Sequence, residues 1–210
     1  MNVSDALLRR KSVRAFSDRE VSTEILKKIL DAARHTPSGV NTQPWQVAVV
    51  TGNQFRNNVK GKMDYSYYPD EWIGPYRARR KSCGLQMYST LNIGRDDKQR
   101  QLDQWAANYR AFDAPVVLFF FLDQVLKTGS YLDYGMFLQS IMLAAVEEGL
   151  ATCPQAALGE YPEIVKQELG YPLDSVLIGG MALGYEDKEA LINSYRTDRL
   201  AVDEFTRFFD

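Results

Sequence analysis

Cysteine and histidine are scarce in this chain, and their scarcity argues against several kinds of chemistry. The 210 residues include 2 Cys and 1 His. Cys83 and Cys153 have neither a metal-ligand nor a redox spacing, so we interpret them as buried or incidental thiols in a reducing compartment. His35 lies near the expected end of a helix, where a solvated or capping role suits a cation. With no His/Cys cluster and no Ser/His/Asp set, we expect neither a metal site nor conventional nucleophilic catalysis.

Nucleotide-binding loops and long apolar segments are also missing. There is no G-x-x-x-x-G-K-[ST] loop, and the glycines do not form G-x-G-x-x-G after a strand. The longest apolar run, residues 114–122, is too short to span a bilayer, and the N-terminus lacks the basic-then-apolar order of a secretory signal. A net charge of −2 gives no general attraction to nucleic acid or to anionic membranes. We therefore expect a cytoplasmic protein without a nucleic-acid or membrane partner, in which any anion is bound locally.

The chain does contain enough apolar sequence for one packed domain over residues 1–210, with 45% hydrophobic and 25% charged residues. Continuous apolar runs predict buried strands at residues 47–52, 115–123 and 176–183. Apolar residues at helical spacing predict helices at residues 4–8, 23–36, 77–91, 98–112, 131–150 and 162–169. We expect the 131–150 helix, apolar over most of its surface, in the interior or, preferably, in a dimer interface. Pro and Gly predict a ring-lined loop at 65–76 and a turn at 153–157.

Two stretches concentrate residue types that bind ligands. Residues 9–14 read Arg-Arg-Lys-Ser-Val-Arg, a cationic cluster with one hydroxyl group. Residues 37–45 read Pro-Ser-Gly-Val-Asn-Thr-Gln-Pro-Trp, a turn whose N–H groups and carboxamides can lie against a flat polar ligand. A cationic cluster alone is as often a solvated helix end as a binding site. Together the two stretches fit a cofactor that has a phosphate group and a ring. Such a cofactor can supply the reactivity in a chain that has no nucleophile and base of its own.

Four motifs, in order along the chain, resemble those of one family. They are Arg-Arg-x-Ser-x-Arg-x-Phe from residue 9, Pro-Ser-x-x-Asn-x-Gln-Pro-Trp from residue 37, Gly-Leu-Ala-Thr-Cys-Pro from residue 149, and a Gly-Gly strand from residue 179 followed by Arg196 and Arg199. Each motif is moderately specific, and together they span almost the whole chain. The sequence is therefore similar to the FMN-dependent nitroreductase family.

The resemblance implies a fold, a cofactor and an activity. Members of that family are intertwined homodimers of an α+β, three-layer α/β/α fold with a mixed central sheet, and they hold two FMN molecules at the subunit interface. The implied activity is reduction of nitroaromatic, nitrobenzoate or quinone-like acceptors by NAD(P)H, in a ping-pong cycle through one site. The apolar 131–150 helix and the Phe-rich segment 202–209 suit such a dimer.

The resemblance also implies roles for individual positions, although no side chain is expected to be catalytic because the chemistry takes place at FMN N5. The implied cofactor-binding residues are Arg10, Lys11, Ser12, Arg14, Pro37, Ser38, Gly39, Asn41, Pro154, Gln155, Ala156, Arg196 and Arg199. Arg10 and Arg199 are the implied phosphate partners, because a guanidinium fork pairs well with phosphate. Arg14 is implied at the flavin N1/O2 edge, the turn at 38–41 at the FMN of the other subunit, and a backbone N–H of 154–156 at N5.

The sequence is less specific about the residues of the acceptor slot and about the reaction that takes place there. Candidate walls are the aromatic residues Tyr65, Tyr68, Trp72, Trp105 and Tyr109, with Tyr67 and Tyr76 nearby, although core packing is the commoner role for any single ring. Thr197 stands where some members have a lysine, so the phosphate charge falls on Lys11, Arg196 or Arg199. Two alternatives stay open: a reductive dehalogenase, for which Lys62 and Glu71 supply residue types without a recognised spacing, and an FMN-binding redox protein without turnover.

Overall fold

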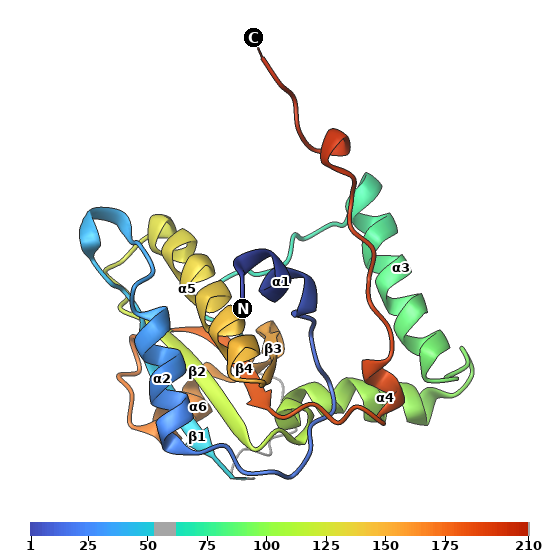
Figure 1. Cartoon of the computed structure of the whole chain (residues 1–210), viewed down its shortest axis with the longest axis horizontal. Coiled ribbons are helices and arrows are strands. Elements are labelled where there is room, and N and C mark those ends of the chain that lie inside the picture. The colour runs from blue at the N-terminus through green and yellow to red at the C-terminus, as the bar shows by residue number, and fades with distance from the viewer. Residues whose placement is uncertain (53–61, 210) are drawn as a thin grey trace.

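The computed structural model describes residues 1–52 and 62–209. A four-stranded sheet lies at the centre, in the spatial order β1 (Gln46–Thr51), β2 (Val116–Leu122), β4 (Val176–Gly184) and β3 (Ala151–Gln155) (Figure 1). The three pairs of neighbouring strands are antiparallel. The resemblance implied a mixed sheet, whereas the described strands form an antiparallel one, and the parallel component found among the described residues is an isolated bridge between Ser12 and Thr152.

One face of the sheet is covered by two helices, α2 (Thr23–Ala33) and α5 (Thr128–Glu147). The α2 helix begins after Ser22, whose hydroxyl oxygen accepts a hydrogen bond from a backbone N–H of the first turn. Both helices contribute to one apolar cluster, through Leu26, Ile29, Ala33, Tyr134, Phe137 and Ile141. The expected interior position is therefore right for one side of the long helix, while Leu132 and Met136 on it are exposed.

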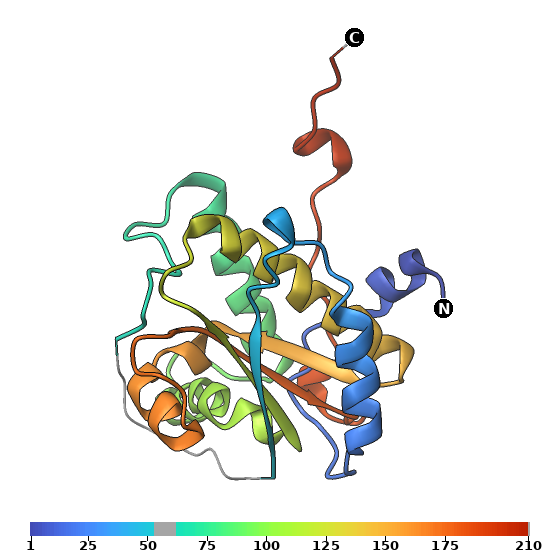
Figure 2. The same cartoon turned by 90° about the vertical axis from the view of Figure 1, so that its left-hand side faces the viewer.

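The other face is covered by α4 (Lys98–Ala106), α6 (Pro162–Leu169) and the 3-10 segments η2 (Ala107–Asp113) and η3 (Ala156–Gly159). A second apolar cluster joins α6, η2 and η3 to the sheet through Tyr109, Phe112, Leu158, Tyr161 and Val165. Figure 2 shows the sheet between this layer and the layer of α2 and α5. The expected three-layer arrangement is confirmed, and β2 between the layers is buried along its whole length.

Two glycines of β4 allow η3 to pack closely on the sheet. A Cβ atom on Gly180 would lie 2.6 Å from Leu158 Cδ1 and 3.1 Å from the carbonyl oxygen of Leu118. Gly179 has a φ of +146°, and a Cβ there would lie 3.0 Å from the carbonyl oxygen of Gln155. Because a larger residue at either position would displace backbone or core side chains, the pair serves close packing.

The region predicted as a turn at 153–157 is instead the end of a strand. Residues 151–155 form β3, which pairs with β4 from Ala151 opposite Gly184 to Gln155 opposite Gly180. Pro154 fits there because β3 is an edge strand. On its outer side no further described strand needs the backbone N–H that proline lacks. The prediction of a turn was therefore wrong, and the backbone leaves the sheet only at η3.

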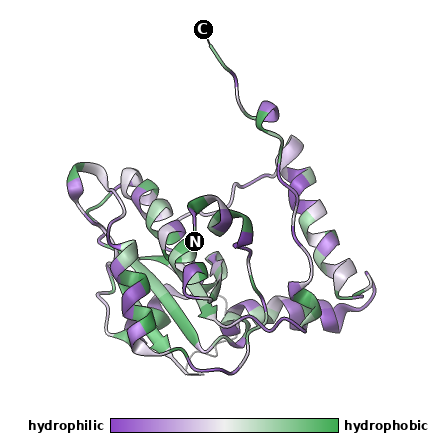
Figure 3. Ribbon diagram, viewed as in Figure 1, coloured by the Kyte–Doolittle hydropathy of each residue, from purple (hydrophilic) through white to green (hydrophobic). Residues whose placement is uncertain are grey.

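Three parts of the chain stand away from the sheet: α1 (Val3–Arg9), α3 (Gly74–Thr90) and the C-terminal segment with η5 (Val202–Glu204) (Figure 1). In Figure 3 the strands are green and much of α3 is purple or white, whereas α1 and the C-terminal segment also contain green residues. None of the described side chains of α3 is buried, and Phe208 and Phe209 are 80% and 88% exposed. Among the described residues, no helix is long and apolar enough to cross a membrane.

Candidate cofactor site

A cavity of about 240 Å³ lies between the segment that follows α1, the C-terminal segment and α3. Its lining residues are Arg10, Lys11, Ser12, Arg14, Cys83, Tyr195, Arg196, Thr197 and Arg199. Six of the predicted cofactor-binding residues, from both ends of the chain, thus surround one hollow.

The cavity is strongly cationic, and the described residues that line it include no acid. Burial lowers the pKa of the Arg10 guanidinium, and the charges of Arg199 and Arg196 lower it further. Arg196 Nη2 donates a hydrogen bond to the carbonyl oxygen of Arg10, which keeps these like charges close together. Because an anion among them would relieve their repulsion, the residues present fit a phosphate group.

The guanidinium group of Arg14 is held at the same cavity. Its Nη1 donates to the carbonyl oxygen of Ser12 at 3.2 Å and to Tyr195 Oη at 3.4 Å. Burial raises the pKa of Tyr195, against the opposing effect of Arg14, so the hydroxyl keeps its proton and can donate it to a ligand. Burial also raises the pKa of Cys153 to about 11. The expectation of a buried thiol is confirmed for Cys153, whereas Cys83 is exposed.

Backbone pairing fixes the segment that carries these side chains. Ser12 forms a parallel bridge with Thr152 of β3, and Phe16 forms an antiparallel bridge with Glu186, beyond β4. Val13 between them is 1% exposed, and its N–H donates to the carbonyl oxygen of Thr152 at 3.1 Å. The segment is therefore tied to the sheet, although it belongs to none of the named strands.

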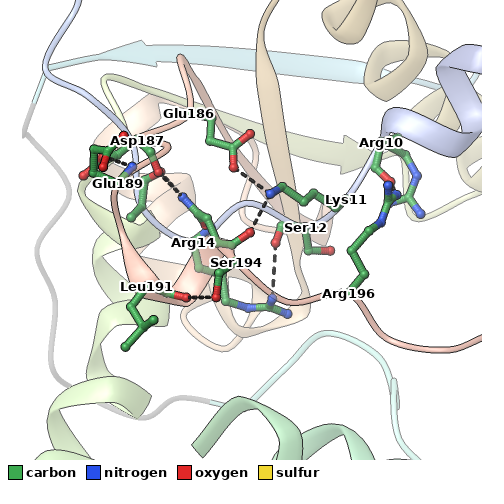
Figure 4. A network of polar contacts seen from close by, with 12 residues as sticks. Arg10, Lys11, Ser12, Arg14, Glu186, Asp187, Glu189, Leu191, Ser194 and Arg196 are labelled. Carbon is green, nitrogen blue, oxygen red and sulfur yellow. Dashed lines mark hydrogen bonds and ion pairs between the residues drawn. The ribbon is translucent and has the colours of Figure 1, made fainter. Parts of the chain in front are cut away.

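Lys11 lines the cavity, but its ammonium group has protein partners (Figure 4). Its Nζ lies 2.7 Å from Glu186 Oε1 and donates to the carbonyl oxygen of Asn193 at 2.5 Å. The carboxylate compensates most of the lysine charge. Of the predicted phosphate partners, Arg10, Arg196 and Arg199 are therefore better placed than Lys11.

The predicted segment at the end of β3 lies close to the same region, because Thr152 pairs with Ser12. Gln155 is 6% exposed, and its Nε2 donates to the carbonyl oxygen of Asn108 at 2.8 Å. Its Oε1 is a buried acceptor that no donor among the described residues reaches. Pro154 and Ala156 flank it at the junction of β3 and η3. An unpartnered buried acceptor fits a site that is completed by a further hydrogen-bond donor.

The turn with Pro37, Ser38, Gly39 and Asn41 does not line this cavity. It packs on α5, where the N–H of Gly39 donates to Asp133 Oδ1 at 3.2 Å. Val40 at its tip is 98% exposed, and Val40 and Asn41 have positive φ angles of 45° and 59°. One chain therefore brings the cationic motif and β3 together but leaves the turn outside, and its expected role at the other subunit stays a prediction.

Residues 7–185 match the family model described as Nitroreductase family. The chain belongs to the nitroreductase family. Similar proteins include a chloronitrobenzene nitroreductase from Comamonas testosteroni, 36% identical over 98% of this chain and 96% of the relative. A 4-nitrobenzoate reductase from Pseudomonas putida is 35% identical over 95% and 92%. The structure of the FMN and NADPH-dependent nitroreductase NfnB from sphigopyxis sp. strain HMH is 38% identical, with a TM-score of 0.93 over 100% of both chains. The resemblance inferred from the motifs is confirmed.

Within this nitroreductase-family chain, the predicted slot aromatics form two groups. Tyr65, Tyr67, Tyr68 and Trp72 contact one another in series, and the Tyr65 ring lies 5.2 Å from that of Tyr131. Trp105 packs edge-to-face on Tyr109, with ring centroids 4.7 Å apart. Tyr109 is only 5% exposed and belongs to the core, so its expected place in a slot wall is not favoured.

Glu160 links the two aromatic groups electrostatically. Tyr109 Oη donates to Glu160 Oε2 at 2.8 Å. Burial raises the pKa of both Tyr109 and Tyr68, and the carboxylate of Glu160 raises each further. Both hydroxyl groups therefore keep their protons at neutral pH.

An ion pair between the buried Lys166 and the partly accessible Asp64, which the motifs did not indicate, fixes the start of the first aromatic group. Lys166 is 2% exposed, and its Nζ lies 2.8 Å from Asp64 Oδ2. The same carboxylate oxygen accepts the N–H of Leu177 at 2.8 Å, and Tyr65 Oη donates to the carbonyl oxygen of Ile178 at 2.7 Å. These bonds attach the aromatic segment to the first residues of β4.

A larger hollow, of about 630 Å³, lies beside the first turn of α2. Asp18, Glu20 and Asp113 are among its lining residues. Carboxylates repel phosphate, so this hollow does not fit the cofactor that the 240 Å³ cavity fits.

Proposed function

We propose that this chain is an oxidoreductase that binds FMN and uses NAD(P)H to reduce nitroaromatic acceptors. The cavity lined by guanidinium groups carries the proposal, because it offers several cations to one phosphate in a protein whose net charge is −2. The similar proteins add the acceptor class, since they include a chloronitrobenzene nitroreductase and a 4-nitrobenzoate reductase. Quinones are a further proposed class of acceptor.

The proposed division of work follows from the positions of the cations. Arg10, Arg196 and Arg199 bind the phosphate group, and Arg14 faces the N1/O2 edge of the ring, where its charge favours added electrons. The end of β3 offers a backbone N–H toward N5. When bound, FMN supplies the hydride chemistry, so the protein contributes orientation, reduction potential and a shaped slot. NAD(P)H and the acceptor occupy that slot in turn, which is a ping-pong cycle.

The proposed assembly is a homodimer. The turn at 37–41 lies away from the cavity of its own chain, with Val40 almost fully exposed. The C-terminal segment carries Phe205, Phe208 and Phe209 on its surface, each at least 66% exposed. A second copy that covers these residues and brings the turn to the cavity satisfies both observations.

The purified full-length protein tests the proposal. We expect one FMN per chain after reconstitution, and a yellow solution that bleaches under anaerobic NADPH and regains its colour on addition of 4-nitrobenzoate. Protein that takes up no FMN would refute the proposal. Bleaching and recovery with an iodinated phenol but not with any nitroaromatic would favour the dehalogenase alternative. Bound FMN that NAD(P)H cannot reduce would favour a redox protein without turnover.

A further inference from the structure

The carboxamide of Asn193 lies in a buried polar network beside the cofactor cavity. The residue is 3% exposed and ends the short 3-10 turn η4 (Leu191–Asn193). Its Oδ1 accepts the backbone N–H of Arg14 at 2.8 Å. Its Nδ2 donates to the carbonyl oxygens of Ala15 at 2.9 Å and of Asp187 at 2.8 Å. Both amide hydrogens are therefore used, and the side chain joins two segments that are far apart in the sequence.

The backbone of Asn193 also takes part. Its carbonyl oxygen accepts a hydrogen bond from Lys11 Nζ, which is in turn paired with Glu186 at 2.7 Å. Asn193 thus contacts residues on both sides of Ser12, the residue whose carbonyl oxygen holds the Arg14 guanidinium. We call Lys11, Glu186 and Asn193 the clasp.

The cations of the cavity come from the two segments that the clasp joins. Arg10 and Arg14 lie on the N-terminal segment, while Arg196 and Arg199 lie three and six residues after Asn193. The N-terminal segment has an isolated bridge to β3 at Ser12 and another at Phe16 to Glu186 beyond β4, and no helix or strand of its own between them. Backbone bonds hold Val13 and Ala15 on either side, and the N–H of Arg14 itself is satisfied by the side chain of Asn193. Because a buried N–H without a partner is costly, this bond helps to fix the backbone at Arg14.

We propose that Asn193 is a positioning residue for the cofactor site. By holding the backbone of Arg14 and Ala15 and, with Glu186, the ammonium group of Lys11, it directs the Arg14 guanidinium into the cavity. Lys11 accordingly belongs to the clasp and is not a phosphate ligand. The inference rests on the proposed function, because it assigns Asn193 an effect on FMN that is exerted through Arg14.

The test compares full-length Asn193→Ala with wild-type protein in three measurements: FMN titration, midpoint potential against a reference dye, and thermal unfolding without FMN. We expect the affinity for FMN to fall about tenfold, the effect of one well-formed hydrogen bond. The midpoint potential should fall as well, because a displaced Arg14 stabilises the reduced flavin less. Ser194→Ala is the matched control, since it removes only the local bond from Ser194 Oγ to the carbonyl oxygen of Leu191. It should leave affinity and potential at wild-type values.

The double variant Arg14→Gln/Asn193→Ala separates positioning from general destabilisation. If Asn193 acts through Arg14, the double variant has the potential of Arg14→Gln alone. Additive shifts in potential, or a lower unfolding temperature with unchanged affinity and potential, would overturn the inference while the proposed function stands. Wild-type protein that binds no FMN would overturn both. If Asn193→Ala does not fold, Asn193→Ser is measured in the same way and judged by the same outcomes.

Discussion

Arg14 and Arg199 line one cavity, but the proposed function gives them different parts of FMN to contact. A charge at the N1/O2 edge is felt more by the reduced ring than by the oxidised ring, and only that difference changes the potential. Arg14→Gln should therefore lower the midpoint potential and slow flavin reduction by NAD(P)H. Equilibration with a reference dye and stopped-flow reduction measure the two effects.

Arg199→Gln is the comparison at the phosphate end. It should weaken FMN binding by about 1.5 to 3 kcal/mol, the range for one hydrogen bond to a charged group, and leave the potential almost unchanged. Arg34→Gln is a suitable control, because Arg34 pairs with Asp31 on the surface of α2 and does not line the cavity. Equal effects of Arg14→Gln and Arg199→Gln on both potential and affinity would refute the assigned roles.

The two cysteines should differ in reactivity. Burial raises the pKa of the Cys153 thiol to about 11 from an ordinary value of 9.0, whereas Cys83 is exposed. At pH 8 we expect iodoacetamide to modify one thiol per native chain, at Cys83, and both after denaturation, as mass spectrometry would show. Because the folded pKa is the higher one, the contribution of Cys153 to stability is present below pH 9 and is lost as the pH rises toward 11. Rapid native alkylation of Cys153 at pH 8 would contradict the burial.

Individual site residues could be found from sequence only where they belong to a motif. Arg10, Ser12, Arg14, Arg196 and Arg199 have the charge and spacing of such motifs, and the structure places them around one cavity. Tyr195, Cys83 and Asn193 were missed, because nothing in their local sequence indicates that folding places them beside the N-terminal segment. The partners of Lys11 were missed for the same reason, since Glu186 is distant in sequence.

At the scale of elements, the contact between η3 and β4 depends on the absence of a side chain at Gly180. Gly180→Ala would place a Cβ against Leu158 and against the carbonyl oxygen of Leu118, so it should destabilise the protein by about 1 to 3 kcal/mol. Urea unfolding measures the change. Gly129→Ala, in the first turn of α5, is the control, because a Cβ there meets nothing within 4 Å. A Gly180→Ala variant as stable as wild type would show that η3 shifts freely.

The errors made in predicting the elements have local physical causes. Continuous apolar runs revealed the three longer strands, and capping by Ser22 and a helical spacing of apolar residues revealed α2. β3 was taken for a turn because Pro154 is rare in strands, and the sequence does not show that this strand lies at an edge. The helix expected over 98–112 is α-helical only to Ala106 and continues as η2, in which Ala111 and Phe112 adopt positive φ angles that their residue types do not suggest.

At the scale of the whole molecule, the proposed homodimer predicts that each cofactor site uses two chains. We expect light scattering to give twice the mass of one chain. Asn41→Ala in the turn and Arg199→Gln in the cavity should each impair both sites of a homodimer. Hybrid dimers formed from the two variants contain one site with wild-type residues from both chains, so mixing should restore FMN binding and activity.

A restoration of this kind requires the turn to act across the interface. If the turn served the cavity of its own chain, every site in the hybrid would carry one substitution and mixing would restore nothing. Mixing Asn41→Ala with Asn41→Ala chains is the control for the refolding or exchange procedure. Light scattering at the mass of one chain with FMN bound would also contradict the dimer.

The bond between Val13 and Thr152 lies on the side of β3 that faces away from β4. A bare strand edge is a template on which another molecule can add a strand, and repeated addition produces aggregates. Segment 12–17, together with Pro154, thus shields this edge against intermolecular growth. A chain lacking residues 1–16 should become turbid at concentrations where the full chain, with or without flavin, stays clear. The segment that carries the arginines would then also keep the protein from assembling into a polymer.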